Sequence, residues 1–132
     1  MSTKFYTLFS PLKIKRVRAK DFMLNLNVYR NTHFHTLNNM KIAYKELMKE
    51  QIEKLPVFQH PIMVKYVLYV GSARLCDTHN ICTIIAKFFT DALTEMGKIP
   101  DDNYTVVVEE RFAFGGIDEA NPRVTIYIKE IR

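Results

Sequence analysis

Apolar positions along the chain predict five strands and two helices. Residues 62–70 are apolar on both faces, because Ile62 and Val64 share one side while Met63 and Val67 share the other. That two-sided pattern is typical of a strand inside a sheet. Alternation and turn residues predict the other strands less sharply. These strands are expected at 4–9, 12–19, 104–112 and 123–131.

The first helix is predicted from Met40 to Lys54. Asn38 or Asn39 provides an N-terminal cap, because their short polar side chains accept hydrogen bonds from free backbone N–H groups. Pro56 stops the helix. The preceding residues, 22–37, are polar and aromatic without helical periodicity, so we expect a loop there.

Asp77 or Thr78 caps a second predicted helix, which runs to about Met96 and ends at Gly97. At about 100° per residue, its apolar positions cover one side and pack on the sheet, while a narrow polar line faces outward. That line consists of Asn80, Thr83, Lys87 and Asp91.

The predicted order of elements, β-β-α-β-α-β-β, indicates an α+β fold in which two main helices pack on a small mixed sheet. The chain has 132 residues and is 48% apolar, which predicts a single domain over 1–132. No apolar run approaches the ~18 residues that a membrane span needs. Glycine-rich phosphate-binding motifs are absent, so nothing in the sequence supports nucleotide hydrolysis.

Two cysteines, Cys76 and Cys82, are too few for a disulfide framework and form no C-x-x-C pair. We expect free thiols in a reducing compartment and no structural zinc site. Residues 1–6 lack the charged-then-apolar layout of a secretion signal. A cytoplasmic location follows from these two expectations.

Charge is divided unequally along the chain. Residues 1–74 hold 13 Lys and Arg against 4 Asp and Glu, a net charge of +9, whereas residues 75–132 hold 6 against 10, a net charge of −4. Much of the positive excess lies in 13–20, where it either protects an edge strand from aggregation or attracts an anionic partner.

Acidic residues gather where the second helix begins and ends. Asp77 follows the central strand, and Asp101 and Asp102 precede the next one. Carboxylates that converge from two such connections would bind a hard cation such as Mg²⁺, and a nearby Lys87 could contact a phosphate. The alternative is structural, since Asp77 is a good helix cap and Asp101-Asp102 a good turn.

Several short motifs occur in an order that resembles the RusA family of Holliday junction resolvases. The family pattern is D-x-D-N, a lysine, D-A-L, a glycine and D-D before a strand. The matching residues here are Asp77-Thr78-His79-Asn80, Lys87, Asp91-Ala92-Leu93, Gly97 and Asp101-Asp102. Residues 25–30, Gly115-Gly116 and 123–126 are also similar to family elements, so the resemblance covers most of the chain.

The resemblance implies a small homodimeric endonuclease that cuts four-way DNA junctions with Mg²⁺ or Mn²⁺, in the cytoplasm of a bacterium or of a phage-infected host. The catalytic residues that it implies are Asp77, Asp102 and Lys87. The implied metal ligands are Asp77, His79, Asp101 and Asp102. The residues expected to contact DNA are Lys13, Lys15, Arg16, Arg18, Lys20, Asn27, Tyr29, Arg30 and Arg74.

Two features depart from the family pattern. His79 stands where the family has a second acid, which removes one negative charge and suits Mg²⁺ poorly. The stretch from Asn80 to Asp91 is also longer than in the family by about four residues, roughly one helical turn. Two alternatives therefore stay open: a degenerate relative that binds branched DNA or a protein without cleaving, and a basic interaction module without metal.

Overall fold

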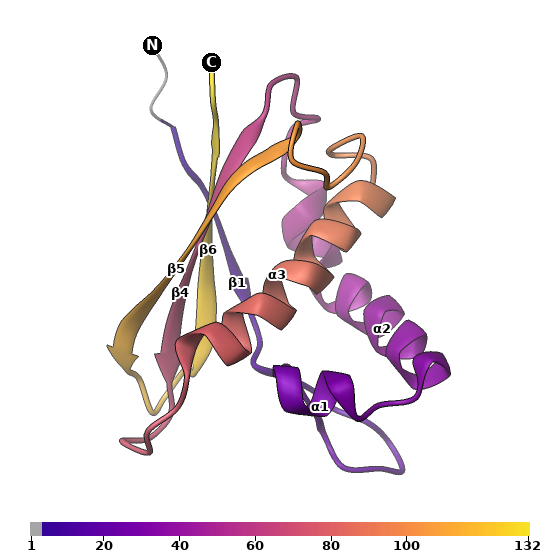
Figure 1. Ribbon diagram of the computed structural model, residues 1–132, viewed down its shortest axis with the longest axis vertical. Coiled ribbons are helices and arrows are strands. Elements are labelled where there is room, and N and C mark those ends of the chain that lie inside the picture. The colour runs from indigo at the N-terminus through magenta and orange to yellow at the C-terminus, as the bar shows by residue number, and fades with distance from the viewer. Residues whose placement is uncertain (1–3) are drawn as a thin grey trace.

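A four-stranded sheet carries the helices on one of its faces in the computed structural model, which describes residues 4–132 (Figure 1). The strand order is β1-β6-β4-β5. β4 pairs in parallel with β5 and antiparallel with β6, and β6 pairs antiparallel with β1. The mixed sheet confirms the predicted α+β class. Its strands are β1 (Tyr6–Ser10), β4 (Ile62–Val70), β5 (Val107–Ile117) and β6 (Arg123–Glu130).

β4 lies inside the sheet, as its two-sided apolar pattern predicts. Ile62, Val64 and Leu68 are fully buried under the helices, and Met63 and Val67 are buried on the opposite face. The parallel pair β4–β5 requires a crossover, which α3 (Thr78–Glu95) supplies. This connection places one face of α3 over the edge of the sheet formed by β5.

α3 begins and ends close to the predicted positions. The Asp77 carboxylate caps it by accepting a hydrogen bond from the His79 backbone N–H at 3.0 Å. Gly97 follows the helix with a φ of 75°, a left-handed conformation that favours glycine. The apolar face of α3, including Ile85, Phe88 and Phe89, is buried in the hydrophobic core.

The predicted loop over 22–37 is wrong, because it contains the helix α1 (Leu26–Arg30) and the first turn of α2 (Phe34–Glu53). Polar residues in this stretch serve as caps: the Asn25 side chain accepts a hydrogen bond from the Val28 N–H, and the His33 ring accepts one from the His35 N–H. α2 thus begins six residues before the predicted start at Met40.

The N-terminal region of the chain also lacks the predicted long second strand. Only Lys13–Ile14 (β2) is extended, and it pairs with Phe22–Met23 (β3) to form a small hairpin. Ile14 and Phe22 are buried, whereas Val17 is fully exposed, so no apolar contact extends the pairing. The Arg16 side-chain Nε–H instead donates to the Lys20 carbonyl and closes the loop.

β5 begins three residues later than predicted. It also ends five residues later than predicted, because its glycines continue the strand. A Cβ on Gly115 would lie 2.6 Å from the Tyr69 ring, so that ring covers the strand where only glycine fits. β6 matches its predicted range to within one residue.

Along residues 4–132, no helix is both long and apolar enough to cross a membrane. Cys76 is exposed and Cys82 is buried, and both are free thiols, as predicted. Residues 1–3, part of the segment compared above with a secretion signal, lie outside the described residues.

Candidate active site

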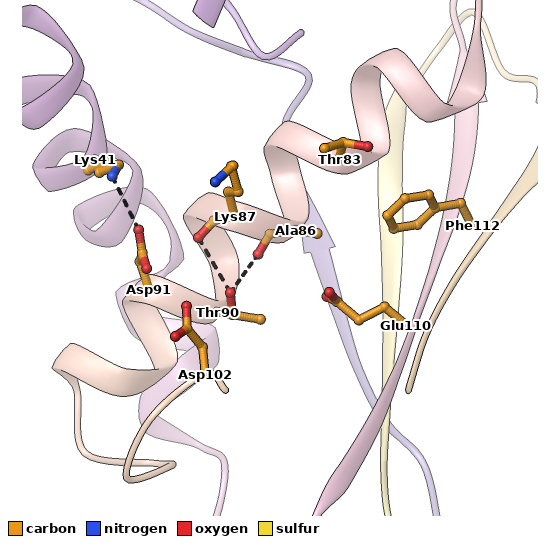
Figure 2. A pocket seen from close by; sticks show the side chains of 9 residues that line it. All are labelled: Lys41, Thr83, Ala86, Lys87, Thr90, Asp91, Asp102, Glu110 and Phe112. Atoms are coloured by element: carbon orange, nitrogen blue, oxygen red, sulfur yellow. Dashed lines mark hydrogen bonds and ion pairs between the residues drawn. The ribbon is translucent and has the colours of Figure 1, made fainter. Parts of the chain in front are cut away.

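A cavity of about 240 Å³ opens between α3 and β5 (Figure 2). Three carboxylates and two amines contribute to its wall. α2 supplies Lys41, α3 supplies Lys87 and Asp91, and the loop before β5 supplies Asp102. Its complete lining is Lys41, Thr83, Ala86, Lys87, Thr90, Asp91, Asp102, Glu110 and Phe112.

The polar line of α3 supplies one wall of this cavity. Thr83, Lys87 and Asp91 recur every four residues and therefore face the same side of the helix. Asn80, the first member of the predicted line, has another role, because its side-chain oxygen accepts a hydrogen bond from the Leu26 N–H at 3.1 Å. That bond attaches the start of α1 to α3.

Glu110 supplies the opposite wall and was not among the residues predicted for the site. β5 places Glu110 and Phe112 on its helix-facing side, in register with Val64 and Tyr66 of β4. The Tyr66 hydroxyl, which is fully buried, donates to Glu110 Oε2 at 2.9 Å. Alternation with Phe112 was the one sequence signal that could have identified Glu110 as inward-facing.

Desolvation and like charge raise the pKa values of Asp102 and Glu110, two of the three acids that line the cavity. Partial desolvation raises the pKa of Glu110, the Tyr66 hydrogen bond opposes that shift, and the charge of Asp102 adds to it. Desolvation followed by the charge of Asp91 raises the pKa of Asp102. These mutually repelling carboxylates would be stabilised by a bound cation.

Asp91 and Asp101 have local partners. The Asp91 carboxylate lies 3.4 Å from the Lys41 amine of α2. Asp101 accepts hydrogen bonds from the Asp102 backbone N–H at 2.8 Å and from Asn103 Nδ2 at 2.7 Å, and these bonds lower its pKa. The two adjacent acids therefore differ: Asp101 orders the loop and Asp102 faces the cavity.

The four metal ligands implied by the resemblance do not line one cavity. Asp77 caps α3, and the His79 ring lies against Phe112 with 5.8 Å between ring centres. Fourteen residues of helix separate Asp77 from Asp91, or about 20 Å at 1.5 Å per residue. Of the implied ligands, only Asp102 reaches the cavity.

Asp102 and Glu110 fit a weakly chelated divalent cation. Across the described residues 4–132, no three acidic, histidine or cysteine side chains gather closely enough to hold a metal ion. Mg²⁺, however, is often bound by one or two carboxylates, waters and substrate phosphates. Asp102 and Glu110 provide that number of oxygen ligands in an open cavity, and Lys87 lines the same cavity.

Most residues expected to contact DNA are open to solvent. The exposed members are Lys13, Lys15, Arg18, Lys20, Asn27, Arg30 and Arg74. Arg16 is half-buried and bonded within the hairpin. Tyr29 is half-buried, with its ring against Phe88 and 5.8 Å from the Lys87 amine. The DNA-binding role of this set stays a prediction.

Replacing Glu110 by glutamine is expected to stabilise the fold at neutral pH. Because the folded-state pKa of Glu110 is raised, the folded state binds more protons than the unfolded state, and stability falls as pH rises above the ordinary value of 4.5. Glutamine keeps the acceptor for Tyr66 but carries no charge. We expect Tm at pH 7 to rise by about 1–3 °C, allowing for solvent screening.

Differential scanning calorimetry at pH 7 and pH 3 checks this result. At pH 3 the gain should vanish, because Glu110 is then protonated in both states. Glu109→Gln is the matched control, since Glu109 precedes Glu110 and its carboxylate pairs with Arg111 at 2.6 Å. A lower Tm for Glu110→Gln than for wild type at pH 7 would contradict the proposed repulsion.

The ordered motifs and the cavity draw on the same elements of the fold. They connect residues from α3, β5 and the intervening loop, which lie next to one another in space. In comparisons with known proteins, the chain matches no family model and no curated sequence.

Proposed function

We propose that this chain is a RusA-like, structure-selective endonuclease that cuts four-way or other branched DNA by metal-dependent phosphodiester hydrolysis. The observation that carries the proposal is the cavity between α3 and β5, which Asp102, Glu110 and Lys87 line together. The order of RusA-like motifs along the chain supports the same activity.

Each cavity residue has a specific role in this proposal. The carboxylates of Asp102 and Glu110 would hold Mg²⁺ or Mn²⁺, which would supply a Lewis acid for the phosphodiester. Tyr66 fixes the Glu110 carboxylate from beneath through its hydroxyl. The Lys87 amine neutralises charge on the phosphate. Lys41 forms an ion pair with Asp91. Asp91 therefore contributes through its negative charge, which raises the pKa of Asp102.

The exposed basic residues of the hairpin, α1 and the loop 71–77 would bind the DNA backbone. Such contacts do not depend on base sequence and weaken as salt is raised. The junction would be selected by its shape. A homodimer would match its own two-fold symmetry to that of a four-way junction, in the cytoplasm of a bacterial or phage-infected cell.

The second candidate is a degenerate relative that binds branched DNA or a protein partner but does not cleave. Its supporting observation is that neither Asp77 nor His79 lines the cavity. Asp77 caps α3, and the His79 ring lies against Thr83 and Phe112. Asp91 is also paired with Lys41 at 3.4 Å. On this reading the basic residues keep their role and the cavity has none.

A labelled four-way junction tests both candidates. With Mg²⁺ or Mn²⁺, the wild-type protein should produce paired, symmetrical nicks near the crossover, while a linear duplex of the same length stays intact. Tight junction binding without nicks in either metal would support the degenerate relative. Equal affinity for junction and linear duplex at moderate salt would exclude both RusA-like candidates.

A further inference from the structure

The hairpin between β2 and β3 presents an aliphatic side chain to solvent at its tip. Val17 is 99% exposed, the highest value among the large apolar residues of the described chain. Arg16 and Arg18 flank it, and Lys15 and Lys20 lie in the same loop. An aliphatic group that is fully exposed between cations is available to a partner that offers both apolar surface and negative charge.

The base of the hairpin is anchored in the core, so its tip has a defined position. Ile14 and Phe22 are buried, and the Phe22 ring stacks on Phe88 of α3 with 6.2 Å between centres. Lys13 and Asp21 form an ion pair across the two strands at 3.2 Å. A rigid loop loses little conformational entropy when a partner binds it.

A second loop with an exposed apolar side chain lies at the same end of the molecule. Leu75 is 96% exposed in the loop 71–77, directly after Arg74. Figure 1 shows this loop and the β2–β3 loop at the lower end, on either side of the start of α3. The core anchors the two loops independently, through β4 and α3 on one side and through the hairpin on the other.

The chemistry of these tips fits the base stack of a nucleic acid. An apolar wedge between cations matches a base step, which offers apolar faces between two phosphates. A lipid bilayer offers a similar combination, but burying one valine contributes only about 1.5–3 kcal/mol. Arg16 and Arg18 would stop deeper insertion. A single side chain is enough to open a base step, whereas it is a weak membrane anchor.

We propose that Val17 is a wedge that inserts into an opened base step of branched DNA, and that Leu75 contacts a second exposed step of the same junction. The inference rests on the proposed function for the identity of the substrate. It adds a separate role, because the wedge selects DNA whose bases are weakly stacked and takes no part in hydrolysis. Opening a stacked step in linear duplex costs a few kcal/mol, whereas bases at a crossover are less firmly stacked.

Val17→Thr tests the wedge, because threonine keeps the branched shape but replaces one methyl with a hydroxyl. The probe is a four-way junction with 2-aminopurine at the crossover, titrated in EDTA so that no cleavage occurs. Wild type should raise the fluorescence as it unstacks the base. Val17→Thr should reduce that rise by at least about half and weaken junction binding by roughly 3–10-fold.

Val108→Thr is the matched control, since Val108 is also exposed but lies on β5. It should behave as wild type, as should both variants on linear duplex. If Val17→Thr unstacks the base and binds the junction as wild type does, Val17 is not a wedge, even if the protein cleaves junctions. Unstacking that depends on Val17 in a protein that never cuts would keep the wedge and exclude the nuclease.

Vesicles containing about one third phosphatidylserine provide the second arm. If wild type binds them and Val17→Thr does not, while junction binding is the same for both, the tip is a membrane anchor and the wedge is overturned. Failure of wild type to bind junctions at all would overturn the wedge and the proposed function together.

Discussion

Replacing Asp102 by asparagine is expected to lower the rate of junction cleavage by at least about 100-fold in Mg²⁺ or Mn²⁺. Metal stabilisation of charge in the transition state is worth several kcal/mol, and each ~1.4 kcal/mol changes a rate tenfold. Asp102 is the implied metal ligand that also lines the cavity. Single-turnover nicking of a labelled junction measures the effect, and binding in EDTA should be unchanged.

Asp77→Asn is the matched comparison. Asparagine caps a helix about as well as aspartate, so the hydrogen bond to the His79 N–H and the start of α3 should survive. The variant loses a carboxylate that the resemblance implies as a metal ligand but that lies outside the cavity. We expect a cleavage rate within about threefold of wild type. A threefold change in rate corresponds to less free energy than the ~1 kcal/mol that one lost neutral hydrogen bond costs.

The pair of variants separates two arrangements of the site. Loss of cleavage in Asp102→Asn alone supports the cavity with Glu110. Equal loss in both variants would show that Asp77 reaches the metal, which contradicts the α3 geometry described above. Retention of full activity in Asp102→Asn would exclude the cavity as the catalytic centre, because Asp102 is the acid that couples electrostatically to both Asp91 and Glu110.

Sequence patterns predicted the parts of the fold in which periodicity and burial agree. β4 and α3 contain long apolar faces, and clear end signals follow β4 at Gly71 and bound α3 at Asp77 and Gly97, so their ends could be placed to within a residue or two. The start of α2 could not, because its first turn has few apolar residues and its cap is a histidine. The β2–β3 hairpin was predicted as a long strand because Val17 looks apolar in sequence but contacts no core.

The candidate site depends on pairings between distant segments, which local patterns do not specify. Alternation with Phe112 separates Glu110 from Glu109, but only the pairing of β5 with β4 shows that the face with Glu110 is the one toward the helices. In the same way, Asp101 and Asp102 looked equivalent, yet backbone and Asn103 hydrogen bonds hold Asp101 in its loop. The polar line on α3 was predictable because it follows helical geometry alone.

Phe88 joins α3 to the segments that would contact DNA, so its replacement by alanine is expected to have the largest effect on stability. The ring is 2% exposed and contacts Phe22 of the hairpin, Tyr29 of α1 and Tyr44 of α2, with ring centres 6.2, 6.4 and 5.7 Å away. Removing a buried phenylalanine typically costs about 3–5 kcal/mol, the sum of lost burial and the cavity that remains.

Urea denaturation of Phe88→Ala should therefore show a free energy of unfolding about 3–5 kcal/mol below wild type. Phe88→Leu fills most of the space and should cost less than half of that. Phe34→Ala is the exposed control and should change stability by less than about 0.5 kcal/mol. If Phe88→Ala were no more costly than Phe34→Ala, the hairpin would not be anchored through this ring.

Because Phe22 stacks on Phe88, partial loss of that anchor should also free the β2–β3 hairpin. Phe88→Leu should therefore bind junctions more weakly, while its α3 cavity keeps its lining.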